Sequence, residues 1–201
     1  QPYFQLEGLT YRIVPILTPS TNEMSIGRVQ SDTMYNNMMN KFVWGNMNDE
    51  CVYLDENNVR MTTNIRINFA RLAEQLLLEG KKDSAVKVLD RCVEVTPDKT
   101  IPYNYFMLNI AMQYYRAGGA YRMIDTAQAN NAELAANKEL IRKGNVITER
   151  IAQIFSENVD YYLSLKGTKY YKLVDTELNQ ALYILQATTN VLKQTNQTEI
   201  S

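Results

Sequence analysis

Histidine is absent from the 201-residue chain, and cysteine occurs only twice, at Cys51 and Cys92. The absence of histidine excludes Ser-His and Cys-His nucleophile activation, histidine metal ligation, and the side chain that normally titrates near neutral pH. Two cysteines are too few for a structural zinc site. They can form at most one disulfide, but each stands in a segment with its own reason for a small apolar residue, so their redox state stays open.

An excess of positive charge and long apolar runs are also missing. The 21 Lys and Arg residues face 22 Asp and Glu residues, and the net charge of -1 gives no strong positive field for binding nucleic acid or anionic membranes. We therefore expect neither partner. The best apolar candidate, Ile101 to Tyr115, contains Pro102 and Asn104, so we expect no transmembrane segment. The chain starts at Gln1 without a signal-peptide pattern, and we expect it to be a piece of something longer.

The few glycines and prolines stand almost entirely between periodic apolar runs, which is typical of helices. We predict a mainly α fold in which an irregular N-terminal segment, residues 1–58, packs on a helical domain, residues 59–201. From Leu9 to Val14 the side chains alternate in a two-residue period, which predicts a short strand with no obvious partner strand. Asp32 is placed to cap a helix that ends before Trp44.

Six helical segments are expected after residue 58, because apolar residues recur there at helical spacing. Gly144 and Gly167 stand at positions typical of helix C-caps. The approximate limits of the segments are Val59 to Glu79, Asp83 to Thr96, Pro102 to Ala117, Ala120 to Arg142, Asn145 to Leu165 and Tyr170 to Gln194.

Residues 66–99 carry a 34-residue helix-turn-helix pattern, RINFARLAEQLLLEGKKDSAVKVLDRCVEVTPDK, which resembles a tetratricopeptide repeat. Small residues would let the two antiparallel helices cross closely, with leucines filling the space beside them. The pattern consists of Phe69, Leu72, Ala73, Leu76, the turn residue Gly80, Ala85, Leu89, Cys92 and Pro97.

A degenerate second repeat is expected over residues 104–137. Met107, Ile110, Ala111, Tyr114 and Gly118 fit its first helix, whereas the second helix fits poorly at Met123, Ala127 and Asn130. Two repeats are too few for a free-standing solenoid. We therefore expect the helices of residues 145–201 to cap the stack.

Five strings together resemble the C-terminal soluble region of a bacterial family of polytopic membrane proteins, which is similar to protein O-mannosyltransferases of the GT-C superfamily. The strings are EGLTYRIVPI from Glu7, NKFVWGNM from Asn40, VYLDENNVRM from Val52, YNYFMLNIA and DYYLSL.

The resemblance implies an extracytoplasmic, periplasmic domain that follows many transmembrane helices in its parent protein. In GT-C enzymes the catalytic acidic residue lies in an early extracytoplasmic loop of the membrane part, and the donor is typically a polyprenyl-linked sugar. None of that machinery is in this sequence, so no catalytic residue of the family can be assigned to a position in this chain.

Repeat domains of this kind bind extended peptides along their first helices. The corresponding positions are mostly apolar or aromatic, and only Arg116 suits a carboxylate clamp. Several occupants of this face stay open: the chain's own N-terminal third or the membrane portion of the parent, a protein partner, and a sugar or lipid-linked sugar ligand. The candidate groove residues are Ile67, Ala70, Glu74, Leu77 and Leu78, followed by Tyr105, Leu108, Met112, Tyr115 and Arg116.

The segment from Trp44 to Asn58 is rich in asparagine and acidic residues and has no helical period, which predicts a structured loop. Its oxygens suit Ca²⁺, but the spacing is not that of an EF-hand, and turn hydrogen bonds are the simpler interpretation. The candidate loop surface consists of Trp44, Asn46, Asp55, Glu56, Asn57 and Asn58.

The sequence thus predicts a non-catalytic interaction domain without cofactor or metal. Its expected partners are the membrane portion of its own parent and an acceptor or partner protein. The alternative is a free-standing tetratricopeptide-type adaptor for a soluble partner. A hydrolase that uses Asp55 and Glu56 is a third hypothesis from a different class.

Overall fold

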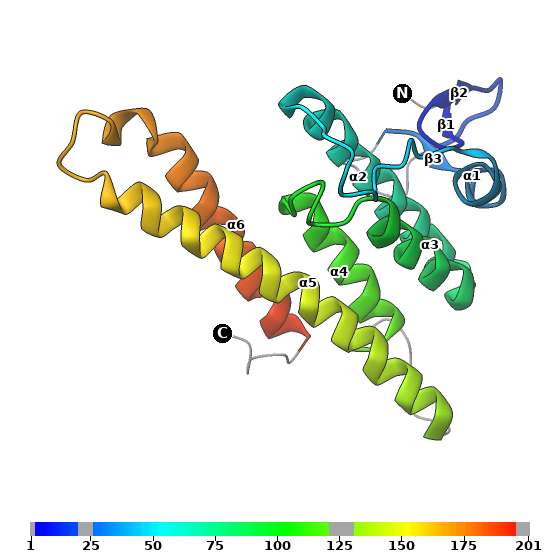
Figure 1. Cartoon of the computed structure of the whole chain (residues 1–201). Coiled ribbons are helices and arrows are strands. Elements are labelled where there is room, and N and C mark those ends of the chain that lie inside the picture. Colours follow the sequence, from blue (N-terminus) through cyan, green and yellow to red (C-terminus); the bar gives the residue numbers. More distant parts are fainter. Residues whose placement is uncertain (1–2, 20–25, 121–130, 196–201) are drawn as a thin grey trace. The chain divides into compact units, whose positions relative to one another are not determined.

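The computed structural model describes residues 3–19, 26–120 and 131–195, and it is mainly helical with a small sheet near the N-terminus (Figure 1). This confirms the prediction of a mainly α fold with a short strand in the N-terminal segment. The chain divides into two compact units, Gln1–Pro102 and Tyr103–Ser201. The predicted repeat of residues 66–99 lies in unit 1, and the helices from residue 105 onward lie in unit 2.

Three short strands form the sheet of unit 1 in the order β2-β1-β3. The predicted strand is β2 (Tyr11–Ile13), and its antiparallel partner is β1 (Phe4–Leu6), which the sequence pattern did not reveal. The third strand, β3 (Arg28–Val29), runs parallel to β1. Gly27 has a φ of 69°, and a Cβ atom there would lie 2.5 Å from the carbonyl oxygen of Phe4, so the approach of β3 to β1 requires glycine.

The helix expected near Asp32 is present as α1 (Ser31–Asn36), which continues as the π-helical turn η1 (Asn37–Lys41). It ends before Trp44, as predicted. Asp32 is not its cap, because Gln30 precedes the first turn and the Asp32 carboxylate accepts a hydrogen bond from Lys81 instead.

Helices α2 (Glu56–Leu78) and α3 (Lys82–Val95) form the helical hairpin of unit 1. Asp55 caps α2 by accepting a hydrogen bond from the backbone N–H of Asn58 at 2.8 Å. Gly80 makes the turn with a φ of 74°. The large and small residues of the predicted repeat are buried between the helices and their neighbours: Phe69, Leu72, Ala73, Leu76, Ala85, Leu89 and Cys92.

Arg66 is a completely buried cation on α2. Its guanidinium group donates to the Thr96 carbonyl oxygen at 3.0 Å, the Ile101 carbonyl oxygen at 2.5 Å and the Pro102 carbonyl oxygen at 3.0 Å, and also to the Thr96 hydroxyl. Thr96 is the C-cap of α3, where a positive charge is favourable. Arg66 therefore fixes the end of α3 and the segment that follows it.

Unit 2 contains α4 (Tyr105–Ala117), α5 (Asn131–Ser164), the 3-10 turn η2 (Tyr171–Leu173) and α6 (Asp175–Gln194). The prediction of two helices separated at Gly144 is wrong, because α5 continues through that residue. A Cβ atom at Gly144 would lie 2.8 Å from the ring of Tyr115, so this glycine lets α4 and α5 approach closely. The second-helix positions Met123, Ala127 and Asn130 lie outside the described residues.

In the ranges that the structure describes, every helix is too short or too polar to cross a lipid bilayer. The same part of the chain holds no group of three or more His, Cys, Asp and Glu side chains placed to bind a metal ion.

Candidate functional site

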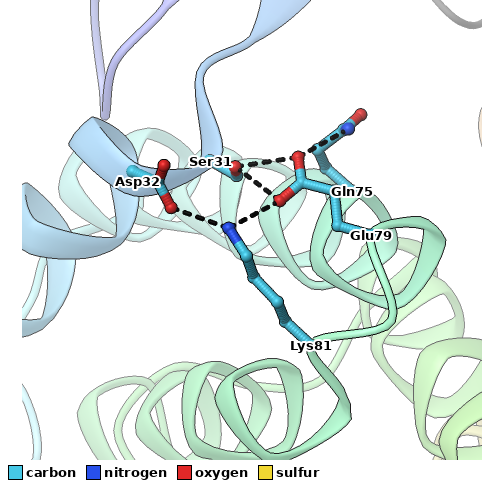
Figure 2. Close-up of polar contacts among 5 residues, drawn as sticks. All are labelled: Ser31, Asp32, Gln75, Glu79 and Lys81. Carbon is cyan, nitrogen blue, oxygen red and sulfur yellow. Dashed lines mark hydrogen bonds and ion pairs between the residues drawn. The ribbon is translucent and has the colours of Figure 1, made fainter.

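Five polar side chains gather where the N-terminal segment meets the turn between α2 and α3 (Figure 2). Ser31 and Asp32 come from the first turn of α1, Gln75 from the last turns of α2, and Glu79 and Lys81 from the turn itself. We call these five residues the turn cluster. Its charged groups come from parts of unit 1 that are distant in the sequence.

Glu79 is the centre of the turn cluster. Its carboxylate accepts from the Ser31 hydroxyl, which lies 2.8 Å from each oxygen, and from the Gln75 side-chain amide at 2.9 Å. The Lys81 ammonium group lies 2.9 Å from Glu79 Oε2 and 2.8 Å from Asp32 Oδ1. Lys81 therefore joins two carboxylates that are 47 positions apart in sequence, and it ties α1 to the turn.

Hydrogen bonds favour the charged forms of Glu79 and Lys81. Burial acts to raise the pKa of Glu79, but hydrogen bonds from Gln75, Lys81 and Ser31 outweigh it, and the net pKa is lowered from 4.5. The pKa of Lys81 is raised from 10.5, first by its hydrogen bond to Asp32 and then by that to Glu79. Glu79 and Lys81 therefore keep their ion pair across the neutral range.

The arrangement suits docking better than catalysis. A serine beside a carboxylate resembles a nucleophile and base, but a carboxylate with a lowered pKa is a weak base at neutral pH. Both oxygens of Glu79 already accept hydrogen bonds from protein donors. We interpret the cluster as a clamp that holds the N-terminal segment on the helical hairpin.

Other contacts hold the same segment. The Arg71 guanidinium group donates to the Tyr11 hydroxyl at 2.8 Å and to the Ile26 carbonyl oxygen at 2.8 Å. It also lies 5.9 Å from the centre of the Tyr11 ring. Thr100 donates to the Met47 carbonyl oxygen at 2.7 Å, and Lys99 pairs with Glu50. The sheet is thus fixed to α2, and the loop to the segment that follows α3.

The candidate groove residues of α2 lie partly at the surface. Ile67, Glu74 and Leu77 are half-buried, Ala70 is buried, and Leu78 is exposed over 56% of its surface. Arg71 is half-buried on the same helix and contacts Tyr11 of the sheet. The more open part of the predicted face is therefore its C-terminal end, next to the turn cluster.

The candidate groove residues of α4 are less available. Leu108 and Tyr115 are buried, and Tyr105, Met112 and Arg116 are half-buried. Tyr115 cannot line an open groove, because its hydroxyl lies 2.9 Å from Asn145 Oδ1 and 3.0 Å from Thr148 Oγ1. Burial raises the pKa of Tyr115 to about 12. Its role is to pack α4 against α5.

One residue of the predicted loop surface, Trp44, does not lie at the surface. Trp44 is buried, with its ring centre 5.2 Å from that of Phe69, because the indole fills space beside α2. Asn46 is exposed and has a left-handed φ of 54°. Asp55 is the cap of α2, and the remaining three residues, Glu56, Asn57 and Asn58, are exposed in its first turn. Turn and cap hydrogen bonds account for this segment.

Both cysteines are free thiols in the structure, with Cys51 exposed and Cys92 buried. Burial raises the pKa of Cys92 to about 12, although the nearby charge of Arg66 and the contact with Thr96 act in the opposite direction. A thiol with this pKa is unreactive at neutral pH. Cys92 is a core residue between α2 and α3.

Sequence reasoning missed the turn cluster. Ser31 and Asp32 are separated from Glu79 and Lys81 by more than forty residues, and neither pair forms a motif by itself. The only local signal was the alternation of charge around Gly80, which is also common in solvent-exposed turns.

A scan against protein-family models found no match, and searches of curated proteins and of solved structures also found none.

Proposed function

We propose that this chain is a non-catalytic helical-repeat interaction domain. In this proposal it forms the extracytoplasmic, periplasmic C-terminal part of a membrane glycosyltransferase-like protein, where it positions acceptor protein or stabilises its parent. The observation that carries the proposal is the packing of α2 against α3, in which the small residues Ala73, Ala85 and Cys92 are completely buried. Close helix crossing at small residues is the packing that the tetratricopeptide pattern requires.

The strings that resemble the O-mannosyltransferase-like family also support a scaffold role. Glu7, in the first string, accepts a hydrogen bond at its carbonyl oxygen from Asn37 at 2.6 Å. Trp44, in the second, contacts Phe69, and Asp55, in the third, caps α2. These residues of the three strings stabilise the fold of unit 1. This role supports a resemblance to the family in structure more than in reaction chemistry.

The absence of histidine and the geometry of the turn cluster favour a binding role over a catalytic one. Ser31 donates to a carboxylate that is held in its charged form, so no strong general base is available to it. The hydrolase hypothesis for Asp55 and Glu56 is weakened by the capping role of Asp55. A turnover assay on Asp55→Asn and Glu56→Gln that shows no change would remove the loop from catalysis.

Acceptor positioning is tested on the open end of the α2 face. Labelled Ser/Thr-rich peptides are titrated with the whole chain, and binding is followed by fluorescence anisotropy. Leu78→Glu should weaken binding about tenfold, because it replaces an exposed apolar side chain of that face by a charged one. Met61→Glu is the matched control, since Met61 is 71% exposed on the same helix but on another face. If Leu78→Glu binds the peptides as well as the wild type does, the acceptor-positioning role is ruled out, and stabilisation of the parent remains as the proposed role.

Membership in a membrane protein is tested by determining the coding sequence upstream of Gln1. Many membrane spans, with an acidic residue in the first extracytoplasmic loop, would support the glycosyltransferase-like parent. A short soluble leader would instead favour the alternative, a free-standing tetratricopeptide-type adaptor with a soluble protein partner. A pull-down with the whole chain would then be the route to that partner.

A further inference from the structure

The connection between α5 and α6 exposes several large apolar side chains in unit 2. Residues 161–174 comprise the end of α5, a turn around Gly167, and the 3-10 turn η2, and we call them the hairpin tip. Its most exposed apolar and aromatic side chains are Tyr161 at 60%, Leu163 at 45%, Tyr170 at 51% and Leu173 at 73%.

The hairpin tip lies beyond the parts of α5 and α6 that α4 contacts. The ring of Tyr115 on α4 packs against Gly144 and Thr148 of α5, and the ring centre of Tyr105 lies 6.2 Å from that of Tyr183 on α6. Tyr161 follows Thr148 by thirteen helical residues, a rise of about 20 Å. Figure 1 shows the tip at the far end of the α5–α6 hairpin, in gold and orange. The tip therefore presents its side chains away from the core of unit 2.

The charge of the hairpin tip differs from that of the whole chain. Lys166, Lys169 and Lys172 are exposed, and no acidic residue occurs between Asp160 and Asp175. The tip carries three positive charges, whereas the net charge of the chain is -1. Overall charge argued against adsorption to anionic membranes, but adsorption depends on the local field within about 8–10 Å of the surface. The three lysines therefore place positive charge on the tip itself, whereas the nearest carboxylates in the sequence, Asp160 and Asp175, stand where the tip joins α5 and α6.

The side chains of the tip combine the features that favour the interface of an anionic bilayer. Tyrosine rings place an apolar body below the headgroups and a hydroxyl group in water, and lysine stems can lie along apolar surface while the ammonium groups contact phosphates. Lys169 Nζ already lies 5.1 Å from the centre of the Tyr170 ring. We infer that the hairpin tip docks on the surface of an anionic lipid bilayer, with Leu163 and Leu173 inserted among the headgroups.

Vesicle flotation of the whole chain tests this inference. Vesicles of phosphatidylcholine with about 30% phosphatidylglycerol should bind the chain at low salt, and vesicles of phosphatidylcholine alone should bind it much less. Replacing Lys166, Lys169 and Lys172 together by Glu should reduce binding at least a hundredfold, because each lysine near such a surface contributes about fivefold. Leu163→Ser with Leu173→Ser should also reduce binding, with the charges unchanged.

The matched control carries Lys41→Glu, Lys87→Glu and Lys138→Glu. These three lysines are exposed and lie outside the tip, and their replacement changes the net charge by the same amount. The control should keep most of the binding, and circular dichroism should show native helicity for every variant. Equal loss in the control and the tip variant, or equal binding to neutral and anionic vesicles, would overturn the inference.

A second measurement reports insertion directly. With Cys51→Ser, the only remaining native thiol is the buried Cys92, so a cysteine introduced by Leu173→Cys can be labelled selectively with an environment-sensitive dye. Anionic vesicles should shift the emission of this dye to the blue. The same dye at Lys87→Cys on α3 should not respond. No shift at position 173, in a protein that still binds the vesicles, would show that the tip is not the docking site.

Discussion

The two units of this chain are stabilised in different ways. In unit 1, charged and polar side chains join segments distant in sequence: Arg66, Arg71 and Lys81 all reach from the helical hairpin to loops or to the N-terminal segment. In unit 2, long helices pack at close range, and Gly144 and Gly118 leave room for the side chains of Tyr115 and Ile141.

The difference follows from the secondary structure of each unit. Short strands and loops leave backbone carbonyl groups that need donors, and arginine provides several donors in a rigid group. Continuous helices satisfy their own backbone groups, so shape complementarity decides how closely they pack. Unit 1 should therefore be sensitive to changes of charge and pH, and unit 2 to changes of side-chain volume.

The largest effect is expected at Arg66. Replacement by methionine keeps apolar volume but leaves the buried carbonyl oxygens of Thr96 and Ile101 without the guanidinium donors, and it should lower the free energy of unfolding by about 4 kcal/mol. Arg66→Lys should recover only part of this loss, because one ammonium group cannot reproduce the geometry of the guanidinium group. Urea unfolding measures both. Arg60→Ala, at an exposed position of α2, is the control and should change stability little. A small effect of Arg66→Met would contradict the role of polar tethers in unit 1.

Gly144→Ala tests close packing in unit 2. The new methyl group would lie 2.8 Å from a ring carbon of the completely buried Tyr115, so we expect a loss of about 1–2 kcal/mol despite the better helix propensity of alanine. Thermal unfolding measures the loss. Ser156→Ala on the exposed surface of α5 should be neutral or stabilising. Stabilisation by Gly144→Ala would mean that α4 and α5 are not closely packed there.

Glu79→Gln tests the turn cluster through its pH dependence. The change weakens the contacts with Ser31 and Lys81, and it should cost about 1 kcal/mol at neutral pH. Because the folded-state pKa of Glu79 is lowered from 4.5, its contribution is complete above that pH and disappears as the pH falls through the lowered value. Urea unfolding between about pH 3 and pH 7 should therefore show the difference between wild type and variant shrinking in acid. A difference independent of pH would argue against the charged clamp.

The smallest effect is expected at the cap of α2. Asp55→Ala removes the acceptor for the Asn58 N–H and should cost somewhat less than 1 kcal/mol, because the site is exposed. Asp55→Asn should change stability little, since asparagine caps about as well. Equal losses in both variants would indicate that the carboxylate charge, and not the cap, is what matters at this position.

Several elements were predictable because their signals are local. The pattern of residues 66–99 placed α2, the turn at Gly80 and α3, and the core residues followed from helical spacing. Gly144 was misinterpreted because one glycine can either end a helix or admit a neighbouring side chain. The Tyr115 ring that distinguishes these roles lies 29 positions away in sequence. Trp44 was expected at the surface, because the residue that it packs against, Phe69, is distant in the sequence.

The sequence by itself determined the helical class, the repeat-like hairpin and the lack of histidine chemistry, because these depend on periodicity and composition within short windows. The tertiary structure decided which charges meet and which apolar side chains stay exposed. Lys81 pairs with Asp32 because α1 packs on the turn between α2 and α3, and Tyr115 is buried because α5 packs against α4. Contacts between distant segments depend on how the chain is brought together in three dimensions, and no local pattern encodes them.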